Sequence, residues 1–150
     1  MTLRFYLAKS KKDLDDIYGH NTSAFFDDAE FKWTKKWLET QRQSGYDIYQ
    51  VRYGKEVVAA LFVKEEEKGL LTKQTPLKFN VQGKGIGHKI KEYVEDLAKK
   101  SGKKNIFNYC AVDNFRMAAL NESHGYEKTG KGDILQEWHK SLSSSLRRLK

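Results

Sequence analysis

The sequence predicts a single α/β domain with a mixed sheet, and three observations support this prediction. Strand and helix patterns alternate along all 150 residues without a break in composition. Hydrophobic residues make up 39% of the chain and aromatic residues 13%, which suffices for a core at this length. One proline and no repeats give no sign of a linker. We expect one domain over residues 1–150, in which about residues 141–150 form a basic tail.

The composition excludes several classes of protein. The only cysteine, Cys110, rules out an intrachain disulfide and a Cys-rich zinc finger, and it suits a reducing, cytoplasmic location. The longest apolar run, Val57–Val63, is too short to span a membrane. The net charge of +8 indicates an anionic partner, either a nucleic acid, a phosphorylated ligand or an acidic surface.

The N-terminal part of the chain predicts one strand followed by two helices. Arg4–Ala8 has a strand pattern, and Ser10 with Asp13 resembles a capping box that begins a helix. Asp27 or Asp28 would cap the second helix, just before its apolar face. That face consists of Phe31, Trp33, Trp37 and Leu38.

A three-stranded meander is expected next. Asp47–Tyr53 is rich in strand-forming residues, and Gly54-Lys55 suits a two-residue turn. The apolar run within Val57–Lys64 predicts a strand buried on both faces. Glu65–Gly69 would turn the chain into a third strand over about Leu70–Leu77.

The rest of the chain alternates helix and strand. A glycine-rich loop, Gly83–Gly87, opens a helix with apolar residues at helical spacing, and Asn105–Val112 is the next strand. Asp113-Asn114 would cap a short helix. A closing hairpin is expected from Tyr126–Thr129 and Asp133–His139.

The glycine-rich loop has the composition of an anion site. Glycines let the backbone approach a ligand closely, and N–H groups at a helix N-terminus favour phosphate. Lys84 and Lys89 add positive charge nearby. Neither the Rossmann fingerprint nor the P-loop is present, because His88 stands where each motif requires a glycine.

Two segments resemble one protein family. Gln82–Gly87 resembles the Q/R-x-x-G-x-G/A loop of the GNAT superfamily of acyl-CoA N-acyltransferases, and Asn114–Tyr126 is similar to the later N-x-x-A-x-x-x-Y-x-x-x-G-F stretch. The resemblance implies a mixed, mostly antiparallel sheet of about six to seven strands with about four helices, splayed at the acyl-CoA site. It also implies transfer of an acetyl group from acetyl-CoA to a primary amine, by direct attack in a ternary complex.

The resemblance also implies which residues hold the co-substrate. Backbone amides of the loop would bind the pyrophosphate of coenzyme A. Main-chain groups near Leu77 and Phe79 would pair with the pantetheine arm, which Asn114 would also line. The loop residues are Gln82, Gly83, Lys84, Gly85, Ile86 and Gly87.

One departure from the family pattern concerns the chemistry. The family's tyrosine, often the acid that protonates the leaving thiolate, is Asn121 here, and asparagine is no acid. Its amide could still donate a hydrogen bond. Cys110 and Ser123 are alternative proton donors, as are Tyr109 and Tyr126. A thiol pKa of about 8.5 also allows the thiolate to leave without an acid.

No general base is evident from the sequence. Asp47 and Glu56 are candidates, although each also reads as an exposed strand-end charge. Glu65–Glu67 could select a cationic acceptor or form a solvated turn. Trp33 and Trp37 could line an acceptor pocket beside Phe25 and Phe26, or pack their helix onto the sheet.

The four histidines have no metal-ligand spacing, so we expect no metal. These are His20, His88, His124 and His139.

Two alternatives remain beside a transferase. The chain could be a degenerate module that binds acyl-CoA without turnover, which Asn121 favours. It could also act on or bind a nucleic-acid-linked acceptor, which the net charge and the basic tail favour. The acceptor, whether a small molecule or a protein, and the oligomeric state are not encoded in any motif.

Overall fold

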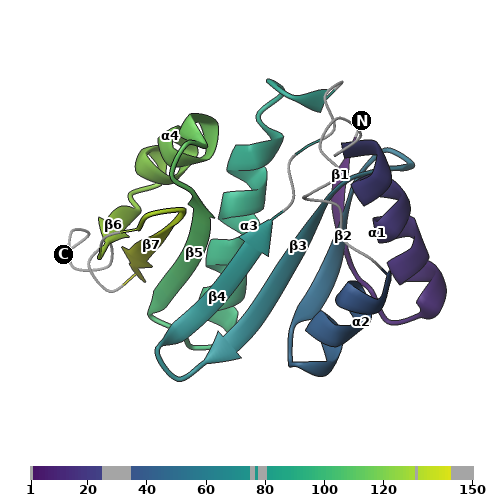
Figure 1. The fold of residues 1–150 in the computed structure, drawn as a ribbon, viewed down its shortest axis with the longest axis horizontal. Helices are drawn as coiled ribbons and strands as arrows, with labels where there is room; N and C mark the ends of the chain where they lie inside the picture. Colours follow the sequence, from purple (N-terminus) through teal and green to yellow (C-terminus); the bar gives the residue numbers. More distant parts are fainter. Residues whose placement is uncertain (1, 25–34, 75–76, 78–80, 131, 143–150) are drawn as a thin grey trace. The chain divides into compact units, whose positions relative to one another are not determined.

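The computed structural model describes residues 2–24, 35–74, 77, 81–130 and 132–142, with side chains omitted for 20–24. Helices and strands alternate along these residues (Figure 1). In order they are β1 (Leu3–Leu7), α1 (Lys11–Ala24), α2 (Lys35–Gln43), β2 (Asp47–Tyr53), β3 (Glu56–Glu66), β4 (Gly69–Gln74), α3 (Ile86–Lys100), β5 (Asn105–Ala111), α4 (Phe115–Ser123), β6 (Glu127–Thr129) and β7 (Leu135–Ser141).

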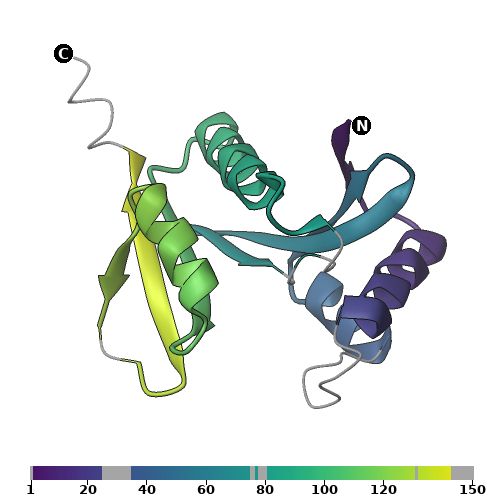
Figure 2. The same ribbon diagram turned by 90° about the horizontal axis from the view of Figure 1, so that it is seen from above.

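The seven strands form a mixed sheet in the order β1-β2-β3-β4-β5-β7-β6. Strand β4 runs parallel to β5, whereas β1–β2, β2–β3, β5–β7 and β6–β7 are antiparallel. Figure 2 shows the short strand β6 beside β7. The predicted α/β class and mixed, mostly antiparallel sheet are therefore confirmed.

The chain divides into two compact units, which are described separately. Unit 1 comprises residues 1–64 and 74–86, and unit 2 comprises residues 65–73 and 87–150. The expectation of a single domain over the whole chain stays a prediction.

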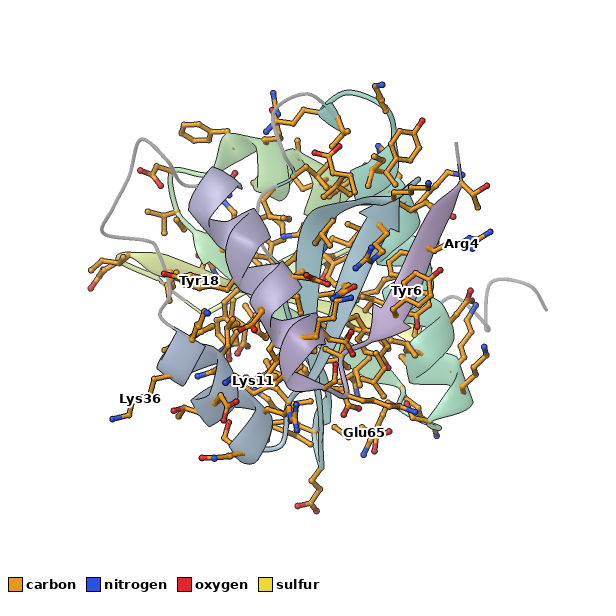
Figure 3. All side chains as sticks on the ribbon, turned by 90° about the vertical axis from the view of Figure 1, so that its right-hand side faces the viewer. Arg4, Tyr6, Lys11, Tyr18, Lys36 and Glu65 are labelled. Atoms are coloured by element: carbon orange, nitrogen blue, oxygen red, sulfur yellow. The ribbon has the colours of Figure 1, made fainter. Side chains whose placement is uncertain are left out.

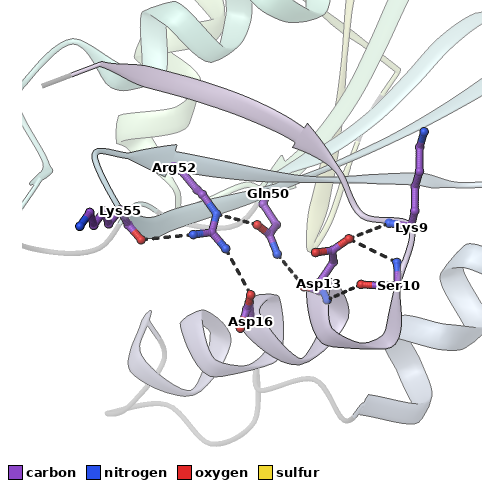
Figure 4. A network of polar contacts seen from close by, with 7 residues as sticks. All are labelled: Lys9, Ser10, Asp13, Asp16, Gln50, Arg52 and Lys55. Carbon is purple, nitrogen blue, oxygen red and sulfur yellow. Dashed lines mark hydrogen bonds and ion pairs between the residues drawn. The ribbon is translucent and has the colours of Figure 1, made fainter.

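In unit 1, α1 begins with the predicted capping box (Figure 4). Ser10 Oγ accepts a hydrogen bond from the Asp13 N–H at 3.2 Å, and Asp13 Oδ2 accepts from the N–H groups of Lys9 at 3.0 Å and Ser10 at 3.3 Å. These backbone donors, led by Lys9, lower the pKa of Asp13. Helix α1 is thus fixed at its first turn by local side chains.

A polar network then ties α1 to β2 (Figure 4). The buried Gln50 donates from Nε2 to the Asp13 carbonyl at 2.9 Å and accepts from Arg52 Nε at 2.7 Å. The Arg52 guanidinium also lies 3.2 Å from Asp16 Oδ2. The buried Gln50 amide is therefore hydrogen-bonded at both its oxygen and its nitrogen, as burial of a polar group requires.

The core of unit 1 lies between its helices and strands. Helices α1 and α2 lie side by side and bury Leu14, Ile17 and Leu38 (Figure 1). The Trp37 ring packs edge-on against Phe62 of β3 at 5.7 Å. This contact supports the packing role for Trp37. Residues 58–63 are all buried, as the apolar run predicts.

The outer strand of unit 1 carries polar side chains. Arg4 and Tyr6 both project from β1 (Figure 3), and Arg4 Nη1 donates to the Tyr6 hydroxyl at 3.4 Å. They share a face because they are two residues apart in a strand. Tyr6 is 44% exposed, so this face of β1 is not part of the core.

The core of unit 2 is formed by one face of α3 and the inward residues of β5 and β7. The buried residues include Ile90, Val94, Ala98, Ile106, Cys110 and Trp138. At the start of β4, a Cβ on Gly69 would lie 2.4 Å from the Asn105 carbonyl oxygen. Only glycine therefore allows β4 to approach β5 so closely.

The β4–β5 ladder pairs three residues and ends at Thr72 opposite Asn108. Strand β4 nevertheless continues to Gln74, and β5 to Ala111. The paired part thus covers only some residues of each strand, and the expected opening of the sheet at an acyl-CoA site stays a prediction.

Several predicted boundaries were wrong. Strand β3 continues through Glu65 and Glu66, so the turn comprises only Glu67 and Lys68 before β4 begins at Gly69. Strand β4 ends at Gln74 instead of Leu77. Cross-strand pairing extends β3 despite its charged end, because alternate residues of a strand can face water. Asp27, Asp28, Phe25, Phe26, Phe31, Trp33 and the tail from 143 onward lie outside the described residues.

Candidate functional site

The glycine-rich loop takes backbone conformations that favour glycine. Gly83 has φ = 82° and Gly85 has φ = 76°, both in the left-handed region. A Cβ at either position would meet nothing within 4 Å. The requirement for glycine is therefore conformational, and the space in front of these two residues is open.

The loop is anchored at both ends within unit 1. Val81 and Ile86 are buried, and Gln82 Nε2 donates to the Leu77 carbonyl at 3.1 Å. Lys84 lies between these anchors with Nζ 5.6 Å from the centroid of the Tyr53 ring. The loop thus carries an exposed positive charge on a fixed backbone.

Helix α3 begins at Ile86, directly after this loop. Its first N–H groups have no partner within the helix, and the helix dipole places partial positive charge at this end. A loop with open glycines that leads into these donors can hold a phosphate group. Gly83 and Gly85 therefore leave open space directly before these donors, and binding of coenzyme A by residues 82–87 stays a prediction.

Glycine is favoured at position 87 for a different reason, namely close packing within unit 2. A Cβ at Gly87 would lie 3.1 Å from Leu120 Cδ2 of α4. The start of α3 therefore lies against α4, so a larger residue here would push on Leu120. Phe79, which was predicted to pair with the pantetheine arm, lies outside the described residues.

Asn114 is the N-cap of α4. Its side chain is exposed, and Oδ1 accepts a hydrogen bond from the Met117 N–H at 3.1 Å. The prediction that Asn114 caps this helix is confirmed. The expectation that Asn114 lines the arm of coenzyme A stays a prediction.

Asn121, which the sequence resemblance aligns with a tyrosine of the GNAT pattern, is fully buried. Its Nδ2 donates to Asn108 Oδ1 at 3.2 Å, and Asn108 Nδ2 donates back to Asn121 Oδ1 at 3.0 Å. This reciprocal pairing satisfies the two amides inside unit 2. A hydrogen bond from Asn121 to a thiolate would use the second N–H of its amide, and that role stays a prediction.

The other proposed proton donors lie in different settings. Cys110 is 8% exposed, and burial raises the pKa of its thiol, so the thiol keeps its proton at neutral pH. It lies two residues from Asn108 on the inward face of β5. Ser123 is exposed, and its hydroxyl donates to the Leu120 carbonyl at 2.8 Å. Their catalytic roles stay predictions.

Two features of unit 2 escaped the sequence analysis. Lys91 is only 4% exposed, with Nζ 4.6 Å from the Tyr126 ring centroid, and burial lowers its pKa to about 8. His88 and His124 contact each other across 36 positions, with Nδ1 and Nε2 only 2.9 Å apart. The sequence could have indicated the burial of Lys91, because it lies three residues before Val94 in the helix. No sequence pattern indicates that His88 and His124 meet, because they are far apart in the chain.

None of the helices in the described ranges is long and apolar enough to cross a membrane. Over the same ranges, no three or more His, Cys, Asp or Glu side chains gather in a metal-binding group.

No family model matches the sequence, and no curated protein matches it either. Solved structures do match its fold. The ribosomal-protein-S18-alanine N-acetyltransferase from Escherichia coli has a TM-score of 0.78 at 16% identity, over 94% of each chain. The PaiA N-acetyltransferase from Thermoplasma acidophilum, in complex with coenzyme A, has a TM-score of 0.74 at 13% identity, over 94% of this chain and 99% of the other.

A third match, an N-acetyltransferase from Staphylococcus aureus Mu50, has a TM-score of 0.74 at 16% identity, over 95% of this chain and 99% of the other. The chain therefore has the fold of the GNAT N-acetyltransferases. At identities of 13–16% the similarity concerns the fold alone.

Proposed function

We propose that the chain is an acyl-CoA N-acyltransferase that holds the pyrophosphate of coenzyme A at Gln82–Gly87 and the N-terminus of α3. The observation that carries this proposal is the pair of open, left-handed glycines, Gly83 and Gly85, directly before that helix in a GNAT fold. Lys84, exposed between them, adds a cation for the phosphates. Acetyl is the acyl group that we assign by similarity to the fold's acetyltransferases.

The reaction that we propose is direct attack of a neutral primary amine on the thioester. A free alkylamine has a pKa near 10, so about one molecule in a thousand is neutral at pH 7 and a proton acceptor accelerates the reaction. The nitrogen–carbon bond forms, the carbonyl oxygen becomes an oxyanion, and the thiolate of coenzyme A leaves as the carbon–sulfur bond breaks. The amine proton passes to solvent or to a side chain.

Loss of the family's tyrosine does not prevent this reaction. The leaving thiolate is a weak base, with a thiol pKa of about 8.5. Water can therefore protonate it after departure. The Cys110 thiol, which burial keeps protonated, is the proton donor within unit 2 that we propose as an alternative, and the exposed Ser123 hydroxyl is another.

The acceptor that we propose is an amine on a small molecule or a protein. One of the matched structures is named a ribosomal-protein-S18-alanine N-acetyltransferase, and this name supports a protein acceptor. A cytoplasmic location is consistent with the single cysteine and with acetyl-CoA as the co-substrate.

A second candidate is an acyl-CoA-binding module without turnover. It is favoured by the Asn108–Asn121 pair, because the residue at the tyrosine position is fully buried and serves as part of the core. This candidate shares the coenzyme A site with the first and differs only in the absence of chemistry.

Release of coenzyme A thiol from acetyl-CoA, measured with a panel of primary amines, separates the two candidates. The transferase predicts release above the rate without amine, with at least one acceptor. Acetyl-CoA binding without amine-dependent release on any acceptor would favour the binding module.

A further inference from the structure

His88 and His124 bring two imidazole nitrogens together on unit 2. His88 lies in the first turn of α3, and His124 is the C-cap of α4. His88 Nδ1 and His124 Nε2 are 2.9 Å apart, whereas the ring centroids are 5.0 Å apart. The rings therefore meet edge to edge through these two nitrogens and do not stack.

This contact requires that one nitrogen carries the proton and the other offers its lone pair. When both facing nitrogens are unprotonated, a cation beside the line that joins them can accept both lone pairs, once the two rings turn toward it. Two nitrogens held at about 2.0–2.1 Å from one ion lie about 2.9 Å apart at a right angle and about 3.4 Å apart at the tetrahedral angle. The observed nitrogen–nitrogen separation of 2.9 Å equals that of a right angle at a tetragonal ion, so binding requires the rings to turn but not the nitrogens to move apart.

A carboxylate lies near the second ring nitrogen of His124. Glu95 Oε1 lies 3.8 Å from His124 Nδ1, the nitrogen that faces away from His88. A carboxylate there favours the proton on Nδ1 and leaves the lone pair on Nε2. Lys140 Nζ holds the same Glu95 oxygen at 2.6 Å, and all three side chains are mostly buried at 14–18% exposure. Glu95 is therefore fixed in this position.

The backbone fixes the distance between the two histidines. Gly87, next to His88, lies against Leu120, which is four residues before His124. The backbone N–H of His124 is itself held by the Leu120 and Asn121 carbonyls. The two rings thus project from helices that touch, and the exposed His88 leaves their meeting point accessible to solvent.

We propose that His88 and His124 form a binding site for a divalent transition-metal ion of tetragonal preference, such as Cu²⁺ or Ni²⁺. Imidazole is a suitable ligand for these ions. Water completes the coordination, because the described residues place no third His, Cys, Asp or Glu in the group. Zn²⁺ would require the nitrogens to move apart by about 0.5 Å. The proposal does not depend on acyl-CoA binding or turnover.

The test is calorimetric titration of the full chain with NiCl₂ in the absence of acetyl-CoA. The expected result is one Ni²⁺ site in the native protein, together with a higher melting temperature when Ni²⁺ is present. His88→Gln and His124→Gln should each abolish this site and the shift. His139→Gln is the matched control, since His139 is bonded to Asn105 and lies outside the pair, and it should retain both.

Glu95→Gln tests the orientation of His124 separately. It should weaken Ni²⁺ binding by about tenfold, because the neutral amide no longer favours the proton on Nδ1. His88 is exposed, so His88→Gln is expected to fold normally, and its melting temperature without metal verifies this. Ni²⁺ binding of native strength in folded His88→Gln, or no Ni²⁺ site in the native protein, would overturn the proposal.

Discussion

Asn108 on β5 and Asn121 on α4 hydrogen-bond each other through both ends of their carboxamides, at 3.0 and 3.2 Å, inside unit 2. Asn121 is fully buried, and Asn108 is 5% exposed. Asn121, which the sequence resemblance aligns with a tyrosine of the GNAT pattern, is therefore one half of a buried polar pair. This pair positions α4 on the sheet of its unit.

The two amides of the Asn108–Asn121 pair should contribute jointly to the free energy of unfolding. Asn121→Leu or Asn108→Leu alone leaves the other amide buried without its partner, at a cost of about 1–3 kcal/mol each. The double variant removes both amides, so its cost should fall below the sum of the single costs by about 1 kcal/mol or more. Urea unfolding of the four proteins measures this coupling. Strictly additive losses would show that the two amides do not depend on each other.

Lys91 should make stability depend on pH in a defined direction. Its pKa is lowered by burial from 10.5 to about 8, so the unfolded chain binds more protons than the folded one between these values. The free energy of unfolding therefore rises with pH between about 8 and 10.5. The difference between the two pKa values corresponds to about 3 kcal/mol, by which the buried charge of Lys91 destabilises the folded state at pH 7.

Lys91→Met isolates this effect. The variant should be more stable than the native protein near pH 7, and the difference should shrink as pH rises toward 10.5. Comparison of the two proteins also cancels the titration of groups that do not interact with Lys91. Urea unfolding from pH 7 to pH 10 measures the difference. A gap that stays constant over this range would mean that Lys91 is not buried with a lowered pKa.

Tyr126 should tolerate loss of its hydroxyl. Within the described residues, the Tyr126 hydroxyl is buried without a hydrogen-bond partner, and burial raises its pKa. Tyr126→Phe removes an unsatisfied group, so the free energy of unfolding should stay unchanged or rise by up to about 1 kcal/mol. Tyr109→Phe is the matched control, because the Tyr109 hydroxyl donates to the Glu137 carboxylate. Its removal should lower the free energy of unfolding. Thermal unfolding compares them, and a clear loss in Tyr126→Phe would contradict the structure.

The fold could be predicted from the sequence wherever the signal is local. The Ser10–Asp13 capping box, the Gly54-Lys55 turn and the Asn114 cap each depend on side chains within a few residues of one another, and all three are confirmed. The buried run in β3 is confirmed for a related reason, since continuous apolar residues are readable without knowledge of the neighbours.

Features that depend on contacts between distant segments could not be predicted. Strand β3 continues to Glu66, next to β4 in the sheet. The charged residues at its end predict a turn instead, because the sequence does not show which strand lies beside them. The pairing of Asn121 with Asn108 and the meeting of His88 with His124 join positions 13 and 36 residues apart. Of the candidate site, the sequence indicated the loop because its glycines are local, whereas the burial of Asn121 required the packing of α4.

Binding of coenzyme A to the loop before α3 is the central claim, and a pair of matched aspartate variants tests it most directly. Gly85 and Gly102 both have left-handed φ values, 76° and 73°, and a Cβ at either meets nothing within 4 Å. Gly85→Asp and Gly102→Asp therefore add the same strain and the same charge at the two ends of α3. Gly85→Ala adds the strain without the charge.

Calorimetric titration with coenzyme A should give weaker binding by about tenfold or more for Gly85→Asp, because a carboxylate there repels the pyrophosphate. Gly102→Asp should bind like the native protein, and Gly85→Ala should lie between the two. If Gly85→Asp binds coenzyme A as tightly as Gly102→Asp does, the pyrophosphate is not held at this loop and the account is wrong.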